Sequence, residues 1–186
     1  MDIFEAISTR RSIKTFTDRP VSDAEIRRML QAAVQAPNHR MTQPWRFYVL
    51  GPEARAAYGR ALGRRKAKRV DETEAAEAVI AKVEATHRTL PAMLAVAMTL
   101  DDNPEIREED YAATHMAIQN LGLAAHAMGL GTHVKSGGIM DDPAARAAVG
   151  VREEERIVAT INVGEPADVP DPKPRHDAGE LTRWVP

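Results

Sequence analysis

The first segment that could do chemistry lies near the start of the chain. Arg10, Arg11, Ser12 and Lys14 place three cations and a hydroxyl within five residues. Guanidinium groups bind phosphate through forked donors, and a serine hydroxyl adds a neutral donor. This composition therefore favours a phosphate cradle. A solvated basic turn explains the same residues equally well, so both interpretations stand at this point.

The second segment, residues 36–45, concentrates amides, an imidazole and an indole between Pro37 and Pro44. Two prolines stiffen a loop, and polar side chains on a stiff loop suit ligand recognition. The alternative is a purely structural loop whose Trp45 belongs to the core. His39 is the imidazole of this segment.

Several other chemistries find no support in the sequence. The absence of Cys excludes disulfides, thiolate metal sites and a Cys nucleophile. His115 and His126 share one expected helix but would stand roughly 16 Å apart, too far to hold one ion. No HExxH, GxSxG or phosphate-loop motif is present. We therefore expect neither a protein-bound metal nor a protein nucleophile.

Charge and hydropathy limit the partners. Lys+Arg 25 against Asp+Glu 27 gives a net charge of −2, which disfavours a nucleic-acid-binding function. No apolar run reaches the ~18 residues that a membrane-spanning helix needs, and the first residues are acidic and unlike a secretory signal. We expect a cytoplasmic protein. The basic run 64–69 is interpreted as solvated surface, with attraction of an anionic cofactor or reductant as the alternative.

The elements that must position these segments follow from hydrophobic periodicity and from capping residues. Two helical segments separate the first two strands, which favours an α+β fold over a βαβ ladder. One domain is expected over 1–186, with an extended, proline-rich tail over 168–186. The expected helices are 2–8, 22–36, 53–62, 73–88, 108–128 and one starting at Asp142, and the expected strands are 46–50, 92–100, 132–135 and 156–163.

Together, these segments resemble one known family. The ordered series RRSIK (10–14), APNHRMTQPWRFYVL (36–50), GLGTHVKSGG (129–138) and IVATINVGEP (157–166) is similar to the FMN-dependent nitroreductases. The short length and the His of the second segment are similar to a compact bacterial subgroup of NAD(P)H nitroreductases. The resemblance implies a nitroreductase-like α+β fold, with a central, mostly antiparallel sheet of about four to five strands flanked by helices. It also implies an interlocked homodimer with FMN at the subunit interface.

The resemblance carries residue roles to positions of this chain. Lys14 matches a cation near the pyrimidine edge of the flavin, where it would tune the flavin potential. His39 matches a position that reaches the FMN of the partner subunit, and Arg175 resembles a C-terminal phosphate arginine. Asn38 and Met41 depart from the residues that many members carry, which leaves the contact near flavin N5 open. The full set implied to bind the cofactor is Arg10, Arg11, Ser12, Lys14, Gln35, His39, Val134, Lys135 and Ser136.

The resemblance also implies the reaction. A hydride would pass from NAD(P)H through flavin N5 to an electron-poor small molecule such as a nitroaromatic or quinone, with ping-pong kinetics. The sequence shows neither the acid of a Rossmann fold nor a recognisable 2′-phosphate arginine, so it does not decide between NADH and NADPH. The alternatives are a flavin-dependent dehalogenase or fragmentation relative, a non-catalytic FMN-holding or redox-sensing module, and a helical interaction protein without a cofactor. The small residues of 108–128 are expected to let two subunits approach closely, and the tail is expected to pack on the partner.

Overall fold

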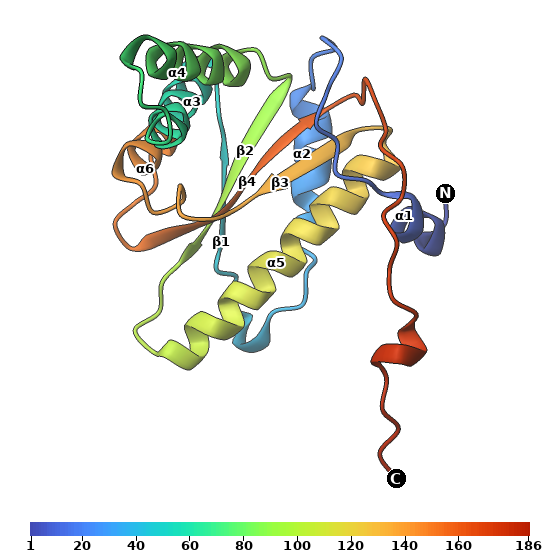
Figure 1. The fold of residues 1–186 in the computed structure, drawn as a ribbon. Coiled ribbons are helices and arrows are strands. Elements are labelled where there is room, and N and C mark those ends of the chain that lie inside the picture. Colours follow the sequence, from blue (N-terminus) through green and yellow to red (C-terminus); the bar gives the residue numbers. More distant parts are fainter.

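A four-stranded antiparallel sheet forms the centre of the molecule (Figure 1). The computed structural model describes all residues, 1–186. The predicted α+β class is confirmed, and so is each of the predicted strands. The sheet order is β1-β2-β4-β3, which puts β1 and β3 at the edges. The strands are β1 (Trp45–Val49), β2 (Ala92–Thr99), β3 (Gly131–Lys135) and β4 (Glu155–Gly164).

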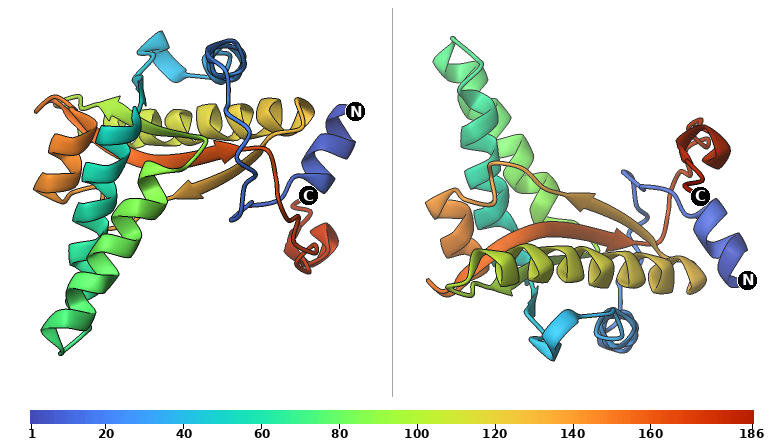
Figure 2. Two further views of the ribbon diagram at one scale, coloured as in Figure 1. Left: turned by 90° about the horizontal axis from the view of Figure 1, so that it is seen from above. Right: turned by 90° about the horizontal axis from the view of Figure 1, so that it is seen from below.

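One face of the sheet is covered by two helices, α2 (Asp23–Ala33) and α5 (Pro104–Ala127) (Figure 2). Leu94 of β2, Met29 of α2 and Leu121 of α5 are fully buried in the core on this side. Trp45 belongs to the same core. The indole of the second chemistry-bearing segment is therefore structural, as the alternative interpretation held.

The opposite face carries three helices over one end of the sheet: α3 (Pro52–Ala67), α4 (Thr73–Arg88) and α6 (Pro143–Val149) (Figure 2). Tyr58 of α3 and Met93 of β2 are buried in the core between these helices and the sheet. The Tyr58 hydroxyl lies 3.4 Å from Thr160 Oγ1, so β4 directs Thr160 toward this side. Helices α3 and α4 form a hairpin that projects from the sheet.

Local capping signals in the sequence set several helix ends. Ser22 and Glu25 form the predicted capping box at the start of α2, each side chain bonding to the other's backbone N–H. Asp142 accepts hydrogen bonds from the amides of the first turn of α6, with Pro143 in the first helical position. Gly129 has φ +76° just after α5, a left-handed conformation that favours glycine.

Three predicted helix boundaries were wrong, and the first is that of α2, which ends at Ala33 rather than at residue 36. Helix α3 does not end near Leu62 but continues to Ala67, so most of the basic run is helical. The reason is Gly63, which allows close helix packing: a Cβ there would stand 2.8 Å from Ile80 Cα of α4. Helix α5 begins at Pro104 rather than at 108, because Asn103 caps it by accepting the Glu105 amide at 2.9 Å.

The small residues of α5 have another role than expected. Ala113, Ala117 and Ala125 are buried in the core of their own chain, against α2 and the sheet. Their size lets α5 approach its own sheet, so the expectation that they face a second subunit was wrong for them. The outward side of α5 instead carries Tyr111 and Met116, which are 37% and 40% exposed.

The two ends of the chain leave large apolar side chains in solvent. Helix α1 (Ile3–Thr9) exposes Phe4 to 81%, and the C-terminal tail exposes Trp184 to 92%. The tail is extended apart from one short 3₁₀ turn, η2 (Ala178–Leu181), and leads away from the sheet. Packing of the tail on a partner stays a prediction.

Candidate functional site

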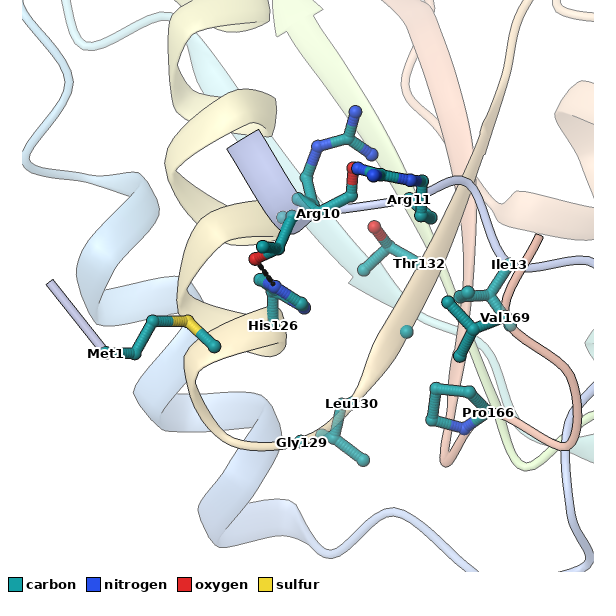
Figure 3. Close-up of a pocket in the computed structure, with 13 residues that line it drawn as sticks. Met1, Arg10, Arg11, Ile13, His126, Gly129, Leu130, Thr132, Pro166 and Val169 are labelled. Carbon is teal, nitrogen blue, oxygen red and sulfur yellow. Dashed lines mark hydrogen bonds between the residues drawn. The ribbon is translucent and has the colours of Figure 1, made fainter. Parts of the chain in front are cut away.

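The basic segment 10–14 lies along the free edge of β3 (Figure 3). Ser12 forms a parallel bridge with Thr132, and the Ile13 amide donates to the Thr132 carbonyl at 2.9 Å. Gly131 makes this approach possible, because a Cβ there would stand 2.3 Å from Ile13 Cγ1. The structure therefore joins the first predicted segment to the strand that carries Val134 and Lys135.

The two arginines of this segment have no carboxylate partner in the chain. Neither Arg10 nor Arg11 forms an ion pair. Arg11 donates only to backbone carbonyls, those of Ser8 at 2.8 Å and Arg10 at 3.0 Å. Both side chains are half-buried. Cations held on a rigid strand edge without a counter-charge are arranged to receive an anion.

A hollow of about 230 Å³ opens beside these arginines. It lies between the end of α1, the last turns of α5 and the start of β3, and Figure 3 shows Arg10, Arg11 and His126 around it. His126 Nε2 lies 2.8 Å from the Thr9 hydroxyl. Burial and then the charges of Arg10 and Arg11 lower the pKa of His126. The imidazole is thus kept neutral next to the arginines.

A second group of cations lies further along β3. Burial lowers the pKa of His133, and the charges of Lys135 and Lys14 lower it further. His133 pairs with Asn162 across the β3–β4 ladder, and residues directly opposite in an antiparallel pair share one face. Asn162 Oδ1 is buried without any hydrogen-bond partner. A buried amide oxygen in this state calls for a donor, which a ligand would supply.

The loop of the second segment is strained. Arg40, Met41 and Gln43 have φ values of 61°, 52° and 46°, in the left-handed region that residues other than glycine seldom adopt. The Asn38 side chain holds the loop by accepting the Gln43 amide at 2.6 Å. The Thr42 hydroxyl in turn donates to the buried Asp110 of α5 at 2.5 Å. Such strain persists only where surrounding contacts impose it, and it is frequent at ligand sites.

His39 lies in this loop, within the 3₁₀ turn η1 (His39–Met41), and forms a pair with α5. Its Nδ1 is 2.8 Å from Glu109 Oε1, while the side chain is 66% exposed. His39 and then Arg40 lower the pKa of Glu109. Gln35 is also exposed, just beyond the end of α2. Both side chains are available to something outside their own chain.

The structure does not bring the two segments together. Arg10 contacts α5 near Gly122, because a Cβ there would lie 3.8 Å from Arg10 Cδ. His39 contacts α5 at Glu109. Thirteen helical residues separate the two contacts, which amounts to roughly 20 Å along the helix. The predicted cofactor residues thus form two groups within one chain: His39 in one, and Arg10, Arg11, Ser12, Lys14, Val134, Lys135 and Ser136 in the other. Gln35 follows the end of α2, where the Ala32 carbonyl accepts a hydrogen bond from Asn120 of α5 at 3.3 Å.

Sequence reasoning missed three polar residues of the β3–β4 region, His133, Thr160 and Asn162. Thr160 and Asn162 are buried, and His133 is half-buried opposite Asn162. A signal was present, since Thr160 and Asn162 alternate within the otherwise apolar run IVATINV. A period of two places both on one face of a strand. Polar residues on a buried strand face need partners and so mark a candidate site.

Other kinds of site receive no support. No three His, Asp or Glu side chains come close enough together to hold a metal ion. None of the helices combines the length and the apolar character that crossing a lipid bilayer requires. Arg175 lies in the exposed tail.

The comparison with known proteins places this fold in one class. The model of the nitroreductase family matches residues 7–165, from α1 to the residue after β4. The matched range contains the whole sheet, the basic segment on its edge and the strained loop. The chain therefore belongs to the nitroreductase family.

Individual relatives agree with this assignment. The Bacillus subtilis (strain 168) protein YfhC, provisionally named an NAD(P)H nitroreductase, is 37% identical over 173 residues, which cover 92% of this chain and 88% of YfhC. A nitroreductase-like family protein from Bacillus cereus has a TM-score of 0.87 at 30% identity, covering 100% of this chain and 96% of that one. A provisionally named nitroreductase from Desulfovibrio desulfuricans, crystallised in complex with FMN, has a TM-score of 0.74 at 26% identity, covering 98% and 96%.

Proposed function

We propose that this protein is an FMN-dependent oxidoreductase that takes a hydride from NAD(P)H and passes it to an electron-poor small molecule, such as a nitroaromatic or a quinone. The observation that carries the proposal is the basic segment 10–14, held on the edge of β3 without any counter-charge. Family membership and the FMN complex of the Desulfovibrio desulfuricans relative support the choice of cofactor.

The donors present suit a flavin mononucleotide. Arg10, Arg11 and Ser12 supply two guanidinium groups and a hydroxyl for the terminal phosphate. Lys14 and Lys135 flank His133 and bring positive charge to the opposite end of the strand edge. When bound, FMN would supply the hydride acceptor and donor, chemistry for which this chain has no side chain of its own.

The chain's own residues would bind FMN, orient its ring system and tune its reduction potential. Arg10 and Arg11 would fix the phosphate, and the β3 edge would fix the position of the ring system relative to it. Positive charge from Lys14 would favour the anionic reduced form and so raise the reduction potential. The buried Asn162 oxygen would gain a donor that the chain itself does not provide.

We further propose that the complete site forms only in a homodimer. His39 is exposed and contacts α5 roughly 20 Å along the helix from the Arg10 contact, so its side chain is available to a second subunit. The exposed Tyr111 and Met116 would lie under a second subunit, and so would the tail beyond 168.

The test is an absorption spectrum of the purified protein after loading with FMN and removal of the excess. We expect retained flavin bands that NADH or NADPH bleaches under anaerobic conditions and that a quinone restores. Arg10→Ala should lose most of the flavin, whereas Arg28→Ala, an exposed unpaired arginine of α2 across the sheet, should retain it. Protein that is dimeric yet retains no flavin would refute the proposal. Flavin that neither nicotinamide reduces would refute its catalytic part.

A further inference from the structure

The end of helix α3 carries a second set of unpaired cations. All of its members are exposed, and none forms an ion pair. Earlier in the same helix hairpin the charges are matched: Arg60 pairs with Glu84 at 2.8 Å, and Arg88 pairs with Glu53. The pairing therefore stops where the charge density is highest. The unpaired set is Arg64, Arg65, Lys66, Lys68 and Arg69.

These cations lie beside the far end of β3. The Arg65 guanidinium rests on Gly138, since a Cβ at that glycine would stand 2.7 Å from Arg65 Nη2. Lys66 is close enough to Lys135 for its charge to lower the Lys135 pKa further, after the larger effect of burial. Gly138 follows the last residue of β3 by only three positions. The tertiary structure thus brings the tip of α3 to the strand proposed to hold the flavin.

The position of this set separates it from the FMN phosphate site. Arg10 and Arg11 lie at the start of β3, by Gly131 and Thr132, whereas Arg65 and Lys66 lie beyond its end, by Lys135 and Gly138. A strand of this length spans roughly 13 Å. One phosphate cannot contact both ends. The second set is arranged for a second anionic group on a molecule that approaches the same strand.

We propose that Arg65 and Lys66 bind the 2′-phosphate of NADPH and so make NADPH the preferred reductant over NADH. The two nicotinamides differ only in that phosphate, and a forked guanidinium donor together with an ammonium group suits a phosphate dianion. This inference rests on the proposed function, because it assumes that a nicotinamide reduces the flavin at this site.

The test combines a selectivity ratio with a direct binding measurement on the FMN-loaded dimer. The first readout is kcat/KM for NADPH divided by kcat/KM for NADH. The second is calorimetric affinity for adenosine 2′,5′-bisphosphate relative to AMP, which isolates the 2′-phosphate without any turnover. Arg65→Ala and Lys66→Ala are compared with Arg28→Ala, which removes the same charge from the opposite face of the sheet.

We expect each of the two substitutions to lower both ratios by roughly tenfold, as for the loss of one charge-assisted contact. Arg28→Ala should leave both ratios within about twofold, and rising salt should weaken bisphosphate binding to the parent protein. Unchanged ratios in Arg65→Ala and Lys66→Ala would overturn the proposal. An equal fall of both ratios in Arg28→Ala would also overturn it, because the effect would then come from the overall charge of the protein and not from a local contact. Loss of bound FMN from the two variants would assign the cations to the cofactor instead. If no nicotinamide reduces the parent protein, the proposed function fails, while the bisphosphate measurement still decides whether the cations bind that phosphate.

Discussion

The two groups of candidate site residues differ in the way their charges are satisfied. The edge of β3 holds Arg10, Arg11 and Lys14 without a carboxylate, in relaxed extended backbone. The loop 38–43 pairs His39 with Glu109 and is held in strained backbone by contacts with α5. The cations on the β3 edge are therefore available to bind an anion. The loop, in contrast, holds the His39 side chain in a fixed orientation toward solvent. In the proposed homodimer the two groups would contribute unlike parts of one site, each from a different subunit.

The largest expected effect comes from substituting a residue of one group in one chain and a residue of the other group in its partner chain. Arg10→Ala chains should bind FMN at least about tenfold more weakly, because a charge-assisted contact to phosphate is lost. His39→Ala chains should also lose affinity. When the two variants are co-expressed, each mixed dimer should regain one intact site out of two. The measurement is flavin content of mixed dimers purified through two different tags.

The control for this experiment is a mixed dimer that carries Arg10→Ala in one chain and Arg28→Ala in the other. It should also hold one intact site, since Arg28 lies outside both groups. If the Arg10→Ala and His39→Ala mixture holds no more flavin than its parents, the two groups do not complete one another across subunits.

A smaller effect is expected where the basic segment contacts the sheet. Gly131→Ala would place a methyl group 2.3 Å from Ile13 Cγ1, so the segment 10–14 must move away from β3. Overpacking of this kind costs about 1–3 kcal/mol of unfolding free energy. The free energy of unfolding, measured with denaturant, and the affinity for FMN should both decrease. Gly51→Ala is the matched control, because no atom lies within 4 Å of a Cβ at that position.

Should Gly131→Ala keep full flavin affinity despite a lower stability, the position of segment 10–14 on β3 would not matter for the cofactor. The contrast between the β3 edge and the loop 38–43 would then no longer hold, and residues elsewhere in the chain would have to contact the phosphate.

The smallest expected effect is a difference in pH response between the two groups. Burial and the neighbouring arginines lower the pKa of His126 below its usual 6.5, so the folded chain binds fewer protons there than the unfolded chain. The folded state therefore loses stability as the pH falls from 6.5 toward the lowered pKa of His126. Glu109 has a lowered pKa as well, so its contribution persists until the pH falls below about 4.5.

Titration by NMR, with unfolding measured in parallel, checks this order. The slope of stability between pH 7 and pH 5 should flatten in His126→Gln but not in Glu109→Gln. Inorganic phosphate should raise the pKa of His126 by neutralising the adjacent arginines. A His126 pKa at or above its usual value without phosphate would contradict the unpaired state of those arginines.

The sequence alone determined the α+β class, the strands and the two chemistry-bearing segments. It did so because these depend on local patterns: the capping box at Ser22, the apolar run of β2 and the cations of 10–14. Local patterns also misled where a close contact decided the outcome. Gly63 resembled a helix end, yet it lies inside α3 because α4 packs against it.

Only the tertiary structure decided how the site is divided. Nothing in the sequence spacing of Arg10 and His39 reveals that their contacts on α5 lie roughly 20 Å apart. The same holds for the cations at the tip of α3, which are distant from Gly138 in sequence and adjacent to it in space. The physical reason is that secondary structure follows from interactions within a few residues, whereas a binding site depends on which side chains long-range packing brings together.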